Sequence, residues 1–246
     1  WCCYCIRCII TNTSNTIATS PDGIIWTGKS KTIFSSSGLG IAWNGGLGAV
    51  TIQHPIIAMG TANTTHSIAY SDNNGLTWRG LGTTIFSIKG NGVVWNGTLW
   101  VGLGEGTNTI AYSYDGTHWT GLGSAIFTSY GNRAIWNGSN FIAVGSGTYT
   151  IATSGDGISW NGLSTTVFSG GNGNSIYWNG ILYVAVGSGT TNTMAYSSDG
   201  TIWTGLGITL FATSGNGVSW NGIYLWIHPK LFRQIMPCWC FLIICN

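Results

Sequence analysis

Residues 113–119 read Ser113-Tyr114-Asp115-Gly116-Thr117-His118-Trp119, a short turn of small and polar residues that ends on tryptophan. Related turns occur at residues 20–26, 71–78, 154–160 and 197–203. The copy at 71–78 is one residue longer and has Asn73 where the others have aspartate. Recurrence of one pattern in units of about 42 residues predicts a repeat protein, in which each copy forms one structural unit.

A second marker, Trp-Asn-Gly, follows each of these turns. The interval between the two tryptophans is 17 residues in four copies and 18 in the copy that begins at Trp160. The second tryptophans are Trp43, Trp95, Trp136, Trp178 and Trp220. A phenylalanine lies nine or ten residues before each of them, at Phe34, Phe86, Phe127, Phe168 and Phe211. Such regular spacing indicates that the repeat is structural.

Each unit is predicted to contain four short strands. In one copy the strands are expected at 93–95, 99–103, 110–113 and 117–121. The Asn96-Gly97 pair predicts a tight hairpin turn with positive φ at both positions. Four antiparallel strands in 40–50 residues are typical of one blade of a β-propeller.

The register of the chain ends predicts how the ring closes. The first copy starts with the third and fourth strands of a blade, at 16–27, and the last ends with the first and second, at 218–227. The sequence therefore predicts an all-β propeller of five four-stranded antiparallel blades, with one blade shared between the two termini. The alternative is an open fragment of a larger ring with six to eight blades.

The two ends differ in composition from the repeats. Seven cysteines lie in the tails, at Cys2, Cys3, Cys5, Cys8, Cys238, Cys240 and Cys245. We therefore divide the chain into a Cys-rich tail at 1–10, the propeller at 11–228 and a second Cys-rich tail at 229–246. The tails are interpreted as foreign to the repeat; if genuine, their crowded thiols favour an oxidising compartment or a metal.

Composition excludes several classes of partner. Charged residues make up 6% of the 246 residues and the net charge is +2, so no basic stripe for nucleic acid is present. The most apolar stretch, 238–245, is too short to cross a bilayer. The four histidines show no metal-ligand spacing, so neither a metal site nor a cofactor is predicted. His54 and His66 belong to an insertion at 46–67 that is expected to be a loop.

The turn Ser-x-Asp-(x)-Gly-x-x-Trp resembles the Asp-box, also called the bacterial neuraminidase repeat, over roughly residues 16–222. The copy with Asn73 keeps the full family spacing, whereas the four copies with aspartate are one residue shorter. The resemblance implies a sialidase-like propeller, in which the box is a structural element of the turn between the third and fourth strands. It implies no single function, since the family contains glycosidases, lectin-like modules and assembly factors.

The same structural role follows from the chemistry of the residues. A short carboxylate in a turn can accept backbone N–H groups, and a tryptophan can fill the space between two sheets. The predicted structural residues are Asp22, Trp26, Asn73, Trp78, Asp115, Trp119, Asp156, Trp160, Asp199 and Trp203.

The carboxylates left over do not make an active site. Four of the five aspartates occupy the box position, Asp72 lies next to that position in the copy at 71–78, and only Glu105 is left over. Glycoside hydrolysis usually needs two carboxylates that flank the scissile bond. The resemblance to sialidases implies that a sialidase active site would also need three clustered arginines for the substrate carboxylate. The repeats contain only Arg79 and Arg133. No catalytic residue is assigned, and the chain is predicted not to be an enzyme.

The leading functional hypothesis is a non-catalytic, lectin-like binding propeller. Four asparagines lie four residues before the second tryptophan, where the innermost strand begins: Asn91, Asn132, Asn174 and Asn216. Amides around the channel mouth suit a neutral sugar, and several weak sites gain affinity together. The alternative is a structural or protein-interaction propeller, part of a larger surface or virion-associated protein. A glycan or a protein is therefore the expected partner, at an extracellular or exposed location.

Overall fold

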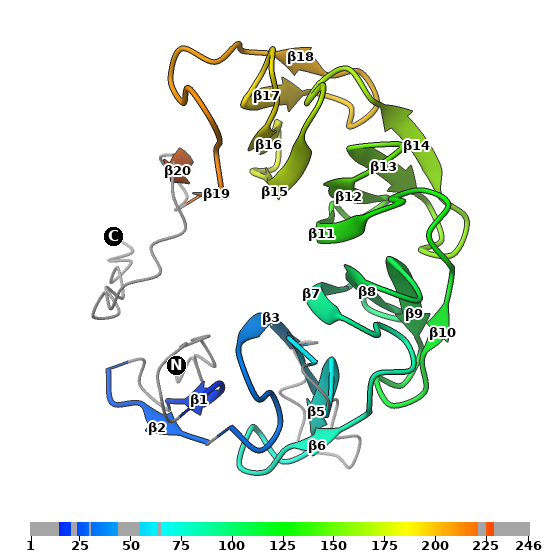
Figure 1. The fold of residues 1–246 in the computed structure, drawn as a ribbon, viewed down its shortest axis with the longest axis vertical. Helices are drawn as coiled ribbons and strands as arrows, with labels where there is room; N and C mark the ends of the chain where they lie inside the picture. Colours follow the sequence, from blue (N-terminus) through cyan, green and yellow to red (C-terminus); the bar gives the residue numbers. More distant parts are fainter. Residues whose placement is uncertain are drawn as a thin grey trace.

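The computed structural model describes residues 15–20, 24–29, 31–43, 55–62, 65–220 and 225–228. This part of the chain forms twenty strands and no helix, and thus none able to cross a membrane. The sheets stand like sectors around a common axis, with β3, β7, β11 and β15 innermost (Figure 1). This arrangement is that of a β-propeller.

Four groups of four antiparallel strands form complete blades, and the pairing of Glu105 with Tyr130 joins the second and third into one eight-stranded sheet. The first complete blade contains β3 (Gly38–Trp43), β4 (Ile56–Gly60), β5 (Ile68–Ser71) and β6 (Arg79–Gly80). The second contains β7 (Lys89–Trp95), β8 (Trp100–Glu105), β9 (Ile110–Ser113) and β10 (Thr120–Gly121). The third contains β11 (Tyr130–Trp136), β12 (Phe141–Ser146), β13 (Ile151–Ser154) and β14 (Asn161–Ser164). The fourth contains β15 (Asn172–Trp178), β16 (Tyr183–Ser188), β17 (Met194–Ser197) and β18 (Thr204–Gly205).

Two further pairs of strands lie near the ends of the chain. β1 (Ala18–Thr19) pairs with β2 (Thr27–Gly28), and β19 (Gly217–Trp220) pairs with β20 (Leu225–His228). Within the described ranges these are separate two-stranded sheets, so the shared fifth blade stays a prediction. The Cys-rich tails at 1–10 and 229–246, together with Asp22 and His54, lie outside the described residues.

The fourth strand of each blade is shorter than predicted. In the second complete blade β10 covers only Thr120–Gly121, because the N–H groups of Thr117 and His118 donate to the Asp115 carboxylate and do not join the ladder. The first strand is longer than predicted, since β7 begins at Lys89 and continues through a β-bulge between Gly90 and Gly92.

The prediction of positive φ at both positions of the Asn96-Gly97 turn is wrong. Trp95 pairs with Trp100, which leaves a four-residue loop between the strands. Gly97 has a φ of 108°, whereas Asn96 does not have a positive φ. The side-chain oxygen of Asn96 instead accepts the N–H groups of Thr98 and Leu99, at 2.8 and 2.6 Å. Asparagine is favoured here because it caps the loop, not because it adopts a left-handed backbone.

The insertion also begins and ends elsewhere than predicted. Residues 56–60 form β4, which pairs with β3 in the same register as the second strand of other blades. The extra residues therefore lie between Trp43 and Ile56. Part of this stretch, residues 44–54, lies outside the described ranges.

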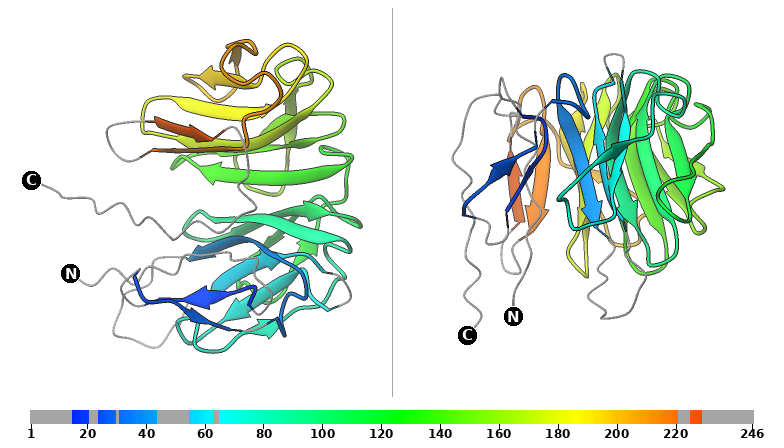
Figure 2. Two further views of the ribbon diagram at one scale, coloured as in Figure 1. Left: turned by 60° about the vertical axis from the view of Figure 1, so that its left-hand side comes forward. Right: turned by 90° about the horizontal axis from the view of Figure 1, so that it is seen from below.

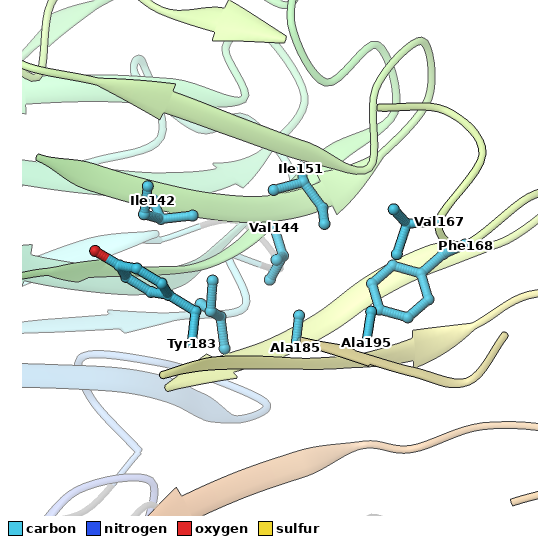
Figure 3. Close-up of a cluster of buried hydrophobic side chains, with 9 residues drawn as sticks. Ile142, Val144, Ile151, Val167, Phe168, Tyr183, Ala185 and Ala195 are labelled. Carbon is cyan, nitrogen blue, oxygen red and sulfur yellow. The ribbon is translucent and has the colours of Figure 1, made fainter. Parts of the chain in front are cut away.

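The sheets stack side by side around the ring (Figure 2), and the hydrophobic core is divided among the interfaces between them. Between the third and fourth complete blades, Ile142 and Val144 of β12 meet Tyr183 and Ala185 of β16 (Figure 3). Phe168, from the link between these blades, completes the cluster and is fully buried. The equivalent linker phenylalanines Phe34, Phe86 and Phe127 are also 0% exposed. The spaced phenylalanines of the sequence therefore act as wedges between neighbouring sheets.

Candidate functional site

The repeated turns are held by a network centred on one carboxylate oxygen. Oδ1 of Asp115 accepts the backbone N–H groups of Thr117 and His118, both at 2.7 Å. The hydroxyl of Ser113 donates to the same oxygen at 3.1 Å and accepts the N–H of Gly116 at 2.8 Å. We call these elements, at 71–78, 113–119, 154–160 and 197–203, the box turns; Asp156 and Asp199 make the same bonds.

These hydrogen bonds keep the carboxylates ionised. The N–H groups of Ser159 and Ile158 lower the pKa of Asp156 to about 2. Those of Ile202 and Thr201 hold the pKa of Asp199 well below its usual range. Partial burial alone would raise the pKa of Asp115, but the backbone N–H and imidazole of His118 outweigh this effect and the net shift is downward.

Three box tryptophans are hydrogen-bonded within their own turns. The indole Nε1 of Trp119 donates to Gly116 O at 3.0 Å, and Trp160 and Trp203 make the equivalent bond. Their rings are half-buried, and all three pack against the hydrophobic clusters between blades. Trp26 is likewise half-buried, whereas its partner Asp22 lies outside the described residues.

The box turn at 71–78 departs from the others. Asn73 Oδ1 accepts the N–H of Thr77 at 2.8 Å, so an amide oxygen replaces one function of the carboxylate. The extra residue, Asn74, adopts a φ of 57°, a left-handed conformation that asparagine tolerates better than most residues. The buried Nε1 of Trp78 has no hydrogen-bond partner among the described residues. This turn therefore holds its tryptophan less firmly than the others do.

The predicted ligand-binding asparagines lie at the junctions between inner strands. Nδ2 of Asn91 donates to Gly131 O in the next blade at 2.8 Å. Asn132 donates to Gly173 O at 2.7 Å and Asn174 to Gly215 O at 3.0 Å. Asn216 Nδ2 donates to Ser214 Oγ at 3.2 Å. We call the three bonds from Asn91, Asn132 and Asn174 the asparagine seam.

The seam restricts what these asparagines can offer to a ligand. A sugar could use the remaining amide oxygen without breaking an inter-blade bond, but competition for Nδ2 would open the junction. The structure thus gives Asn91, Asn132 and Asn174 a structural role between blades, and their role in binding stays a prediction.

Two side chains near the seam were not identified as site residues from the sequence. Lys89 Nζ lies 3.0 Å from Glu105 Oε2 and 5.5 Å from the centre of the Tyr130 ring. Arg133 follows the seam residue Asn132 and donates to Leu39 O, 94 residues away, at 3.0 Å. The signal that could have found Arg133 is its repeat position, which holds glycine or serine in the other copies.

Comparison with known proteins supports the fold alone. No family model matches the chain, and no curated protein sequence matches it either. Several solved structures are similar, among them a nidogen/laminin complex with a TM-score of 0.55 and 13% identity, covering 77% of this chain and 71% of that one.

Two other similar structures have a TM-score of 0.53. The Niastella koreensis GH74 enzyme is 16% identical, with coverage of 78% of this chain and 27% of that one. YCF48 bound to D1 peptide is 18% identical, with coverage of 77% and 59% respectively. All three are β-propeller proteins, which agrees with the architecture described above.

We expect the box carboxylates to make the stability of the fold depend on pH. Their pKa values are lower in the folded state than the ordinary value near 4, so the stabilisation is present above about pH 4 and is lost as the pH falls toward 2. The urea midpoint of the wild type should therefore be lower at pH 2.5 than at pH 6. In the triple variant Asp115→Asn/Asp156→Asn/Asp199→Asn, this drop should be smaller. Asp72→Asn is the matched control and should retain the wild-type drop; an equal drop in the triple variant would contradict the assignment.

Proposed function

We propose that the chain is a non-catalytic binding propeller that docks an apolar segment of another protein on the face formed by the box turns. This face also carries the loops between the first and second strands. Trp100, the first residue of β8, pairs with Ser113, the last residue of β9, so the loop before β8 and the box turn after β9 lie at the same end of the blade. Four large apolar side chains are exposed on it by 67% or more: Leu76, Tyr114, Ile181 and Ile202.

The box turns present these side chains on a rigid backbone. Ile202 illustrates this, since its own N–H donates to Asp199 Oδ1 at 2.9 Å while its side chain remains 76% exposed. A side chain on a fixed turn loses little further conformational entropy when it binds, which favours affinity. The structural neighbours give limited support, because the solved structures include nidogen in complex with laminin and YCF48 bound to a peptide.

A non-catalytic role is supported by how the described carboxylates are used. Asp115, Asp156 and Asp199 accept backbone N–H groups within their own turns. Glu105 pairs with Lys89, and Asp72 lies 3.7 Å from Arg79. A glycosidase needs a pair of carboxyl groups directed at one substrate bond, and these five groups are instead committed to separate local structures.

Selection from a phage-displayed peptide library tests the apolar face. We expect enrichment of peptides rich in aromatic and aliphatic residues. Binding should weaken by at least about tenfold in the variant Leu76→Ser/Tyr114→Ser/Ile202→Ser, because burying apolar side chains supplies the affinity. Ile88→Ser, in a link between blades, is the control and should bind like the wild type. Enriched peptides that bind the triple variant equally well would exclude this face.

Carbohydrate binding on the opposite face is the second candidate. The turns between the second and third strands carry exposed hydroxyls there, at Thr107, Thr148 and Thr190. Equivalent polar groups in successive blades could hold neutral sugars with low individual affinity and raise the total by multivalency. The amide oxygens of the asparagine seam would lie at the inner rim of the same face.

A glycan array screen tests this candidate. Selective binding to neutral glycans is expected, with loss of signal in Thr107→Ala/Thr148→Ala/Thr190→Ala, which removes exposed hydroxyls and leaves the seam intact. Thr98→Ala, on the box-turn face, is the matched control. A blank array from folded protein would reject carbohydrate binding and leave the apolar face unaffected.

We also propose that β1 and β2 complete the blade begun by β19 and β20, which would make five blades. Leu206 and Leu210, in the link after the fourth complete blade, are 44% and 69% exposed. The residues equivalent to Leu206 are Leu81, Leu122 and Leu163, and those equivalent to Leu210 are Ile85, Ile126 and Val167; all six belong to or pack against core clusters. A completed fifth blade would cover Leu206 and Leu210 in the same way.

Substitution of equivalent glycines tests the fifth blade. A Cβ on Gly92 would lie 2.6 Å from Asn132 O in the next blade, whereas one on Gly217 meets nothing within 4 Å among the described residues. If the ring closes, Gly217 faces the first complete blade, and Gly217→Ala should destabilise about as much as Gly92→Ala, by about 1–3 kcal/mol in urea unfolding. Gly155→Ala, at an exposed turn, is the control. A neutral Gly217→Ala beside a destabilising Gly92→Ala would indicate an open ring.

A further inference from the structure

Arg133 is unusual for its place in the repeat. The residue directly after the seam position is Gly40, Gly92, Ser175 or Gly217 in the other inner strands. These residues are small because neighbouring inner strands approach closely, as the 2.6 Å from a Cβ on Gly92 to Asn132 O demonstrates. A long cationic side chain at this position therefore has to leave the interface between blades.

The side chain of Arg133 runs along the inner wall of the ring. It starts from β11, and its Cδ lies 3.5 Å from where a Cβ on Gly92 of β7 would be. Its Nη2 then donates to Leu39 O of β3 at 3.0 Å. The side chain thus passes in front of the second blade and reaches the first, and it remains exposed to solvent.

The charge of Arg133 has no acidic partner in the part of the chain that the structure describes. The ion pairs found there involve Arg79, Lys89 and His118. A guanidinium stays charged in proteins. Among the described residues this one is bonded only to a neutral carbonyl, so its remaining N–H groups are available to an anion.

The shape of the guanidinium and the strands of the inner wall indicate which kind of anion would bind. A guanidinium presents parallel N–H groups that match a carboxylate in a bidentate pair. Beside it, β3, β7 and β15 have a ladder on one side only among the described residues, apart from a single bridge between Lys89 and Thr61. These strands are innermost (Figure 1), so backbone groups of their other edges are directed toward the axis. An extended peptide can pair with such edges, and a peptide with an acidic side chain would satisfy both features.

We propose that Arg133 is the cation of a second binding site, on the inner wall of the ring, which takes a carboxylate carried by a peptide. This site is separate from the apolar face of the box turns, so either can fail without the other. Arg133 recognises the carboxylate through its remaining N–H groups, while Leu39 O holds the guanidinium in place.

The test is an NMR titration of the full chain labelled with ¹⁵N, following the Arg133 Nε–H signal and the backbone N–H of Gly40 and Gly92. The probes are acetyl-Gly-Glu-Gly-amide, its Gln counterpart, and sodium acetate, each at constant ionic strength maintained with sodium chloride. We expect saturable shifts with the Glu peptide, and at least about tenfold weaker binding of the Gln peptide because a neutral amide cannot form the charged pair.

Variants then assign the effect to Arg133. Arg133→Ser introduces the residue found at the same repeat position in the fourth blade, and it should weaken the Glu peptide at least about tenfold. Arg79→Ser removes an arginine from an outer strand and should leave binding unchanged. Arg133→Lys keeps the charge without the planar fork and should weaken binding to an intermediate degree.

Three results would overturn the proposal: no saturable shift in the wild type, equal shifts with the Glu and Gln peptides, or Arg133→Ser and wild type with the same affinity. Acetate binding as tightly as the Glu peptide would also overturn the peptide assignment, because the peptide backbone would then contribute nothing to binding. The wild-type titration decides the first two points even where a variant folds poorly.

Discussion

The ring depends on the asparagine seam, a hydrogen bond from an inner-strand side chain to the backbone of the next blade. It recurs at three junctions, with distances of 2.8, 2.7 and 3.0 Å. Each acceptor is a glycine that also approaches the preceding blade closely: a Cβ on Gly131 would lie 2.6 Å from Thr109 O. The same asparagine–glycine pair thus provides a hydrogen bond between two blades and allows their backbones to approach closely. Because the bonds are partly withdrawn from water, leaving either partner unpaired is costly, and the wide apolar interfaces between blades depend on this spacing.

Strand and box turn compete for the same backbone donors. In each box with aspartate, two N–H groups that could extend the fourth strand donate to the carboxylate instead. The outermost strand therefore begins only after the turn, at Thr120, Asn161 and Thr204. These strands have two, four and two residues, and short outer strands present few unpaired groups at the rim, which limits edge-to-edge association. One turn motif thus sets both the position of the tryptophan and the residue at which the outer strand begins.

The repeat, the four-stranded blade and the box turns could be predicted from the sequence because they depend on local chemistry and regular spacing. Ser113, Asp115 and Trp119 lie within seven residues of one another, so their partners are visible in the sequence. The seam could not be predicted, since Asn91 and Gly131 are 40 residues apart and nothing local distinguishes a donor to a neighbouring blade from a donor to a ligand. The Asn-Gly loop was mispredicted for a related reason: asparagine serves two turn geometries, and only the pairing of Trp95 with Trp100 distinguishes them.

The departures from the repeat gather around the first complete blade, which is where specialised properties should arise in an array of near-equal units. Leu39 replaces the seam asparagine there and cannot donate to the next blade. The box turn of the same blade has Asn73 instead of aspartate and leaves the buried indole of Trp78 unsatisfied. Yet this blade receives the long-range bond from Arg133 to Leu39 O. Leu39 is both the residue that lacks the seam donor and the residue whose carbonyl accepts the bond from Arg133. The first complete blade, which makes no seam bond to the second, is therefore linked to the third blade by the guanidinium of Arg133. A charged group at only one of several equivalent positions breaks the symmetry of the inner wall. A ligand with a carboxylate would therefore bind to this ring of similar blades in one orientation.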